Sequence, residues 1–207
     1  MLQLDFDGTL TKNNVGLEIM QHFTTSKESL DTISQAYSKG EISIEQCIEE
    51  AWRLVDAPPN AIKHYAMHFS QFRGNIIHFQ HSLIEANIPF VITSFGHPAY
   101  ILPFLAQSYS LITPHFILDN KRWKVFLPTN MKTHVVHNLN TTIYVGDSLS
   151  DWNAALAVHK KGGKVFAPKD SILSKTTLFC SEQFNPHNVA TYDTLEELLD
   201  LVLHYGQ

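Results

Sequence analysis

Short apolar runs that end in polar residues and alternate with helical patterns place the strongest constraint on the fold. Four such runs occupy residues 2–7, 88–93, 142–145 and 164–166, and amphipathic helical patterns separate the last three. Strands that alternate with helices predict a doubly wound parallel sheet, because parallel strands need a crossover connection. Ligands of such sheets bind at the carboxyl ends of the strands. We therefore expect the functional residues of this chain where the apolar runs end.

A helical segment of residues 15–71 interrupts this alternation directly after the first strand. Ser43 and Gln46 belong to a capping box, and Pro58–Pro59 separates two amphipathic patterns within the segment. A helical block of this length predicts a second, smaller domain inserted into an α/β core. A strand or hairpin is expected around residues 116–127, and a helix from Pro98 to about Gln107.

Composition argues against several classes of protein. The 207 residues are 44% hydrophobic and 17% charged, which predicts a packed core, and a net charge of −5 argues against nucleic acid or anionic membranes as partners. The N-terminus has no signal-peptide pattern, and no apolar run reaches the roughly 18 residues that span a bilayer. Cys47 and Cys180 suggest neither a zinc site nor a disulfide framework. We expect a soluble, cytoplasmic protein.

Two aspartates and a glycine end the first apolar run. Strand alternation places Asp5 and Asp7 on one side of the strand, and Gly8 lets the backbone turn sharply. Neighbouring carboxylates repel, so a cation or a proton must stabilise the pair. One carboxylate can then act as a nucleophile or metal ligand while the other transfers a proton. Taken alone, the motif is also explained by an acidic surface turn.

A hydroxyl follows the second apolar run, and a cation begins a later helix. Ser94 directly follows the run 88–93 and precedes a helix that Pro98 can begin, so its hydroxyl and nearby N–H groups can bind phosphate. Lys132 lies at the start of a helix, where its ammonium group can neutralise a phosphoryl oxygen. Taken singly, Ser94 is also explained as a helix cap and Lys132 as a solvated lysine.

The run 142–145 ends in a second pair of carboxylates. Asp147 and Asp151 follow it at a spacing that allows both to share one hard cation, Asp147 directly and Asp151 directly or through water. An acidic helix start is the alternative explanation of this pair. Together, three strand ends and one helix start supply a nucleophile, a proton donor, a hydroxyl, a cation and metal-binding carboxylates, in one order along the chain.

As a set, these residues resemble the four sequence motifs of the phosphatases of the haloacid dehalogenase superfamily. The residues that carry the resemblance span most of the chain: Asp5-Phe6-Asp7-Gly8-Thr9, Ser94, Lys132 and Gly146-Asp147-Ser148 with Asp151. The resemblance implies a Rossmann-like core of residues 1–14 and 72–207, with residues 15–71 as an inserted all-helical cap domain. It further implies a Mg²⁺ cofactor and a small phosphorylated metabolite as substrate.

The resemblance assigns the catalytic roles residue by residue. Asp5 would attack phosphorus and form an aspartyl-phosphate. Asp7 would protonate the leaving oxygen and then accept a proton from the hydrolytic water. Ser94 and the backbone N–H of Phe95 would hold the phosphoryl oxygens, and Lys132 would neutralise their charge.

The same resemblance implies the metal ligands. Asp5, the backbone carbonyl of Asp7 and Asp147 would hold Mg²⁺, with Asp151 in support. Asp7 also separates the reactions of the superfamily, because a halide leaves without a proton whereas an alkoxide needs one. The sequence therefore favours phosphomonoester cleavage over dehalogenation.

Within the superfamily, the chain is similar to the subgroup that contains phosphoserine phosphatase and 2-hydroxy-3-keto-5-methylthiopentenyl-1-phosphate phosphatase. Asn14 stands where both enzymes carry an acidic residue, so the positive amine of an amino-acid substrate would lose its partner. Phe95 replaces a glycine that is usual beside the serine of the second motif. Asn14 and His97 are candidate substrate contacts, and neither the ester nor the oligomeric state follows from the sequence.

Three alternatives share part of this pattern. A phosphotransferase of the same family would use the same groups with an acceptor other than water. A catalytically silent regulatory member would bind phosphate without turnover. A signalling receiver domain also combines aspartates, a hydroxyl, a lysine and magnesium, but its phosphorylated aspartate lies on a later strand, whereas Asp5 follows the first run.

Overall fold

A six-stranded parallel sheet forms the centre of the protein. The computed structural model describes residues 1–106, 111–175 and 184–205, so Gln107 and Cys180 lie outside the described residues. The strands lie in the order β3-β2-β1-β6-β7-β8. Their bounds, in that order, are Leu111–Ile112, Phe90–Thr93, Leu2–Leu4, Ile143–Val145, Lys164–Pro168 and Val189–Tyr192. The predicted doubly wound α/β architecture is confirmed, because every neighbouring pair in this sheet is parallel.

The first strand of the chain lies in the middle of the sheet. Leu4 of β1 is in register with Ile92 of β2 on one side and with Val145 of β6 on the other. The residues that follow these three positions therefore leave the sheet at one common edge. This register is what places the ends of three separate apolar runs side by side.

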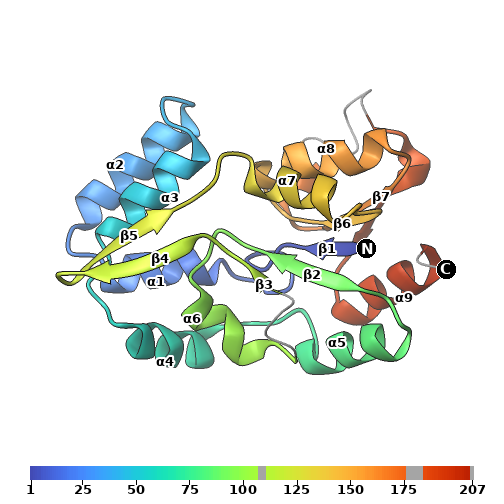
Figure 1. Ribbon diagram of the computed structural model, residues 1–207, viewed down its shortest axis with the longest axis horizontal. Coiled ribbons are helices and arrows are strands. Elements are labelled where there is room, and N and C mark those ends of the chain that lie inside the picture. The colour runs from blue at the N-terminus through green and yellow to red at the C-terminus, as the bar shows by residue number, and fades with distance from the viewer. Residues whose placement is uncertain (107–110, 176–183, 206–207) are drawn as a thin grey trace.

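Helices cover both faces of the sheet (Figure 1). One face carries α7 (Met131–Asn138) and α8 (Trp152–Lys160), and the other carries α5 (Ile76–Glu85) and α9 (Leu195–Tyr205). The alternation of strand side chains explains the two layers, since Val165 and Ala167 of β7 pack in the cluster that contains α8 residues, whereas Phe166 packs in the larger core. The centre of β7 is consequently apolar on both sides, as in other buried parallel sheets.

Residues 15–71 are helical, as the sequence predicts. They form α1 (Val15–Phe23), α2 (Lys27–Ser38), α3 (Ile44–Arg53) and α4 (Pro59–Phe69). The caps agree with the sequence pattern: Ser43 and Gln46 make the capping box of α3, and Pro58 precedes the first turn of α4. Whether this segment behaves as a separate domain stays a prediction.

A two-stranded antiparallel hairpin lies apart from the main sheet. It consists of β4 (His115–Asp119) and β5 (Arg122–Phe126), joined by Asn120 and Lys121 with φ of 48° and 62°. Positive φ at both central residues is typical of the two-residue turns that match the twist of a hairpin. The hairpin, which the sequence left open as a strand or hairpin, packs against α3 of the helical segment, where the rings of Phe116 and Trp52 are 5.2 Å apart.

Three details differ from the sequence-based expectation. The short edge strands β3 and β8 were not predicted, because runs of two and four residues give little periodicity. The helix expected to begin at Pro98 ends at Ile101 as α6, and a 3₁₀ turn, Leu102–Phe104, follows it. Pro103 lies in that turn and has no N–H to continue an α-helix. Among the described residues, no helix is both long and apolar enough to cross a membrane.

Candidate active site

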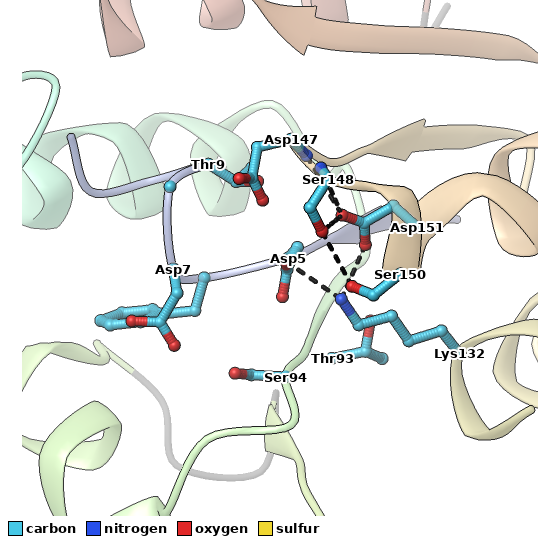
Figure 2. A network of polar contacts seen from close by, with 12 residues as sticks. Asp5, Asp7, Thr9, Thr93, Ser94, Lys132, Asp147, Ser148, Ser150 and Asp151 are labelled. Atoms are coloured by element: carbon cyan, nitrogen blue, oxygen red, sulfur yellow. Dashed lines mark hydrogen bonds and ion pairs between the residues drawn. The ribbon is translucent and has the colours of Figure 1, made fainter. Parts of the chain in front are cut away.

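The polar ends of β1, β2 and β6 converge on Asp5. Figure 2 shows Asp5 between Asp7 on one side and Lys132 with Asp151 on the other, with Ser94 nearby. The Lys132 ammonium nitrogen lies 3.0 Å from Asp5 Oδ2 and 2.7 Å from Asp151 Oδ1. The start of α7 and the turn after β6 thus meet the end of β1 at one point.

The ion pairs of this cluster are almost completely shielded from solvent. The side chains of Lys132, Asp5 and Asp151 are 3%, 7% and 0% exposed. Burial raises the pKa of Asp5 well above its usual range, and Asp151 and Asp147 add to this effect against the opposing charge of Lys132. Burial alone would lower the pKa of Lys132, but the charges of Asp151 and Asp5 outweigh it, so the ammonium form is stabilised.

Asp151 has a carboxylate that is saturated with donors. Its Oδ1 accepts hydrogen bonds from Lys132 Nζ and from the Tyr144 hydroxyl at 2.7 and 2.6 Å. Its Oδ2 accepts from the Asp147 N–H, the Ser148 N–H and the Ser148 hydroxyl at 3.1–3.2 Å. Although burial opposes ionisation, these partners lower the pKa of Asp151. The arrangement suits a permanent anion that orients Lys132.

Asp147 is held by far fewer groups. Its Oδ1 accepts one hydrogen bond, from the Thr9 hydroxyl at 3.3 Å. Burial, followed by the charge of Asp151, raises the pKa of Asp147 to about 7. Gly8 adopts a φ of 73°, and a Cβ there would come within 2.3 Å of Asp147 Oδ2, so only glycine allows this close approach.

Asp5, Asp147 and Asp151 together could hold a metal ion. One carboxylate oxygen from each lies within 4.8 Å of the others. Oxygen-rich sites of this kind suit hard cations such as Mg²⁺. The raised pKa values of Asp5 and Asp147 fit the same interpretation, since like charges at this separation need a cation to remain ionised together.

Asp7 is not one of the three carboxylates that could hold a metal ion. Its Oδ2 accepts a hydrogen bond from the Tyr100 hydroxyl, and its Oδ1 accepts one from the Gly16 N–H at 3.1 Å. Burial raises the pKa of Asp7, while the hydrogen bonds from Tyr100 and the start of α1 oppose this rise. A carboxyl whose pKa is raised by burial suits a proton donor.

Ser94 and Phe95 lie where β2 ends, beside the end of β1. Ser94 is buried, and its hydroxyl oxygen accepts a hydrogen bond from the Gly96 N–H at 3.0 Å. The Lys132 ammonium nitrogen lies 4.8 Å from the centre of the Phe95 ring. The second motif is therefore next to both Asp7 and Lys132, as Figure 2 shows for Ser94.

The two candidate substrate contacts lie in different settings. Asn14 is exposed and caps α1, with its Oδ1 accepting from the Leu17 N–H at 2.9 Å. His97 is 4% exposed, and its ring lies 4.4–5.5 Å from the rings of Trp52, Phe116 and Trp123. Burial lowers the pKa of His97 to about 4, so the ring is neutral at pH 7.

Several residues that support the site gave no signal in the sequence. Arg73 donates two hydrogen bonds to the Gly8 carbonyl at 2.9 and 3.3 Å and one to Asp170 at 2.8 Å. The Gln3 side chain, buried within β1, donates to the Lys132 carbonyl at 3.0 Å. The polar Gln3 within an otherwise apolar run is the one sequence feature that could have indicated such a role.

Proteins that are similar to this chain in sequence or in fold include phosphatases. A 2-hydroxy-3-keto-5-methylthiopentenyl-1-phosphate phosphatase of Bacillus cereus (strain ATCC 14579) is 25% identical over 195 residues, which cover 83% of this chain and 84% of the relative. The solved structures that share the fold include the following two. One is a phospho-aspartyl intermediate analogue of phosphoserine phosphatase, with a TM-score of 0.69, 17% identity and 97% of each chain covered.

The other solved structure is a phosphoserine phosphohydrolase-like protein of Francisella tularensis, with a TM-score of 0.70, 18% identity, and 97% of this chain and 98% of that one covered. The chain is therefore similar in sequence to known phosphatases and similar in fold to phosphoserine phosphatase. No family model matches it. The similarity thus rests on distant relatives and on the fold. Tyr100 and Arg73 make contacts at the site that the four sequence motifs do not describe.

Proposed function

We propose that this chain hydrolyses a small phosphomonoester with Mg²⁺ through transient phosphorylation of Asp5. The broad class is given by its relatives, which are phosphatases, and the chain is accordingly a phosphoric monoester hydrolase. The observation that best supports the detailed mechanism is the buried contact of 3.0 Å between Lys132 and Asp5, beside two further carboxylates. Burying three anions around one cation is costly for stability. Such a cluster is therefore better explained by a role in catalysis than by a role in folding.

In the first step, an Asp5 oxygen attacks phosphorus and the bond between phosphorus and the leaving oxygen breaks. The Lys132 ammonium group and the Ser94 hydroxyl, with the Phe95 N–H, stabilise the phosphoryl oxygens as charge develops. Lys132 does not need to move, because Asp151 already fixes it at 2.7 Å. Groups held in place before the reaction lower the barrier without reorganisation.

Asp7 transfers the protons of both steps. It gives its proton to the leaving oxygen in the first step, which releases a neutral alcohol. In the second step it accepts a proton from water, whose oxygen attacks the phosphorus and releases Asp5 and inorganic phosphate. The position of Asp7, two residues after the nucleophile and outside the carboxylate cluster, supports this division of roles.

Magnesium is the metal that we propose for the carboxylates. Asp5, Asp147 and the Asp7 carbonyl would hold it, and Asp151 would support the site through Lys132 and Ser148 rather than through a free oxygen. When bound, Mg²⁺ supplies neutralisation of phosphoryl charge and alignment of the ester. The sequence left open whether Asp151 contacts the ion directly or through water, and the proposed supporting role favours indirect action.

Residues 15–71 are proposed to act as the cap that selects the substrate. Their contact with the core includes the Glu45 carboxylate, which accepts a hydrogen bond from the Asn130 N–H at 3.1 Å, two residues before Lys132. The hairpin packs on the same segment through Trp123, whose indole N–H donates to the Ala57 carbonyl at 3.1 Å. We infer that the hairpin belongs functionally with the cap, with Asn14 and His97 near its junction with the core.

Phosphate release across a panel of phosphorylated metabolites, with Mg²⁺ or with a chelator, tests this proposal. The wild type is expected to release phosphate only with the metal, and Asp5→Asn is expected to be inactive because the amide cannot form an acyl phosphate. Asp31→Asn, an exposed position on α2, is the matched control and keeps full activity. Activity in Asp5→Asn, or phosphate binding without turnover in the wild type, contradicts the proposal.

A further inference from the structure

Tyr100 contacts the proposed proton donor but belongs to none of the four motifs. It lies in α6 (Pro98–Ile101), six residues after Ser94, and is 0% exposed. Its hydroxyl donates to Asp7 Oδ2. From this contact and the packing around it, we propose that Tyr100 is a positioning residue that orients Asp7 for proton transfer to the leaving group, an inference that rests on the proposed function above.

The Asp7 carboxyl group is fixed from two directions. Tyr100 holds Oδ2 from the core, and the Gly16 N–H holds Oδ1 from the first turn of α1 at 3.1 Å. Two donors on different oxygens define both the position and the plane of a carboxyl group. The Val15 N–H adds a further hydrogen bond to the carboxyl group. A carboxyl oxygen has two lone pairs, so Oδ2 can carry the transferred proton while it accepts from Tyr100.

The backbone comes close to the Tyr100 hydroxyl, which also has a side-chain hydrogen bond with Ser94. A Cβ at Gly16 would come within 2.7 Å of the hydroxyl oxygen, and a Cβ at Gly96 within 1.8 Å. Neither glycine has a positive φ, so these positions need glycine for space rather than for backbone conformation. The ring itself packs beside Phe6, with centroids 6.0 Å apart. Three segments of the chain therefore enclose one phenol oxygen.

The contact sets Tyr100 apart from a tyrosine that only fills the core. A phenylalanine would fill the same volume, and a buried hydroxyl needs a partner that offsets its desolvation. Here that partner is the carboxyl group that must approach the leaving oxygen. Because geometry controls the efficiency of proton transfer, loss of the hydroxyl should affect that transfer more than binding or folding.

The test compares two esters that differ in their need for a proton. The leaving group of 4-nitrophenyl phosphate departs as a stabilised phenolate, whereas that of benzyl phosphate departs as an alcohol after protonation. The quantity measured is kcat/KM, which reports only the steps up to phosphorylation of Asp5, where the leaving group departs. Asp7→Asn is the reference and is expected to lose on the order of 100-fold or more with benzyl phosphate and far less with 4-nitrophenyl phosphate.

Tyr100→Phe is expected to reproduce this selectivity on a smaller scale. We expect kcat/KM for benzyl phosphate to fall on the order of 10- to 100-fold and that for 4-nitrophenyl phosphate to change by less than about threefold. Tyr192→Phe is the matched control, because its hydroxyl is equally buried but donates to the Thr9 carbonyl at 3.0 Å. Any loss in that variant should be the same for both esters.

Equal losses for both esters in Tyr100→Phe, or no loss, overturn the inference. If that variant does not fold, Gly16→Ala carries the test, since its methyl group displaces the same contact and should give the same ester-dependent loss. A lack of ester dependence in Asp7→Asn would instead contradict the proposed function. The two failures are therefore distinguishable.

Discussion

The two sides of Asp5 are built in different ways. On the side of β6 and α7, all partners come from the core, and Lys132 and Asp151 have their polar atoms satisfied by several groups. On the side of the helical segment, single hydrogen bonds and tilted aromatic rings make the contacts. Two buried donors there, Trp52 Nε1 and His97 Nε2, have no hydrogen-bond partner among the described residues.

This difference suggests that the core side of Asp5 carries out the reaction and that the side of the helical segment selects the substrate. The groups that stabilise a phosphoryl charge must be in place before the ester binds, and a dense network of buried charges provides that rigidity. The region next to the helical segment has fewer satisfied polar groups and more aromatic surface, which suits contacts that depend on the organic part of a substrate. Four predictions test whether the contrast holds.

The largest expected effect is on the core side. Asp151→Asn should lower the free energy of unfolding by ~3–5 kcal/mol, because an amide nitrogen would face donors and Lys132 would lose its nearest anion. Asp147→Asn should change it by less than about 1 kcal/mol, since Asp147 accepts one hydrogen bond and repels its neighbours. Denaturant unfolding with a chelator measures both. Similar losses in the two variants would show that the carboxylates are held alike.

Arg73 tests whether the core side extends to the turn after β1. Arg73→Met should cost ~1.5–3 kcal/mol, because it removes a buried charged donor from the Gly8 carbonyl. Arg53→Met, which breaks an exposed ion pair with Glu49 on α3, should cost less than about 1 kcal/mol. The same unfolding measurement applies, and a cost for Arg73→Met no larger than its control would contradict the argument.

The pH dependence of the free energy of unfolding tests the side of Asp5 that faces the helical segment. The pKa of His97 is about 4 in the folded protein, below the ordinary value of 6.5, so the unfolded chain binds more protons between these values. The contribution of His97 to stability is thus complete above pH 6.5 and is lost as the pH falls toward 4. His97→Asn keeps an acceptor for the Ala99 N–H. Between pH 7 and pH 5, the free energy of unfolding should fall by ~1–2 kcal/mol less in this variant than in the wild type.

The control for this prediction is His81→Asn, at an exposed position of α5. It should leave the acid dependence of unfolding unchanged. An identical acid dependence in wild type and His97→Asn would show that the buried ring is not the group that resists protonation, and the contrast between the two sides would then need another basis.

The smallest expected effect concerns the contact between Glu45 and Asn130. Glu45→Ala should lower the free energy of unfolding by ~0.5–1.5 kcal/mol, since a single hydrogen bond from a backbone N–H is lost. Glu49→Ala, on the same helix, should cost ~0.2–0.5 kcal/mol through its exposed ion pair. A loss in Glu45→Ala as large as that in Asp151→Asn would remove the distinction between the two sides.

Much of the site could be predicted because its residues follow local patterns. Asp5 and Ser94 come directly after an apolar strand, and Asp147 comes two residues after one. The carboxyl ends of parallel strands are where such sheets bind ligands. The support of the site could not be predicted in this way. Arg73 and Tyr100 follow no motif, and their partners are 65 and 93 residues away in the chain.

The sequence by itself determined the alternation of strands and helices, the helical segment after β1 and the order of the chemically active residues, since each depends on neighbours within a few positions. Only the tertiary structure decided that β4 and β5 pack on α3, that His97 is enclosed by aromatic rings, and that Asp151 is saturated while Asp147 is not. The physical reason is the same in each case. Burial and the pairing of charges depend on which distant segments of the chain are in contact. Local sequence patterns do not predict those contacts.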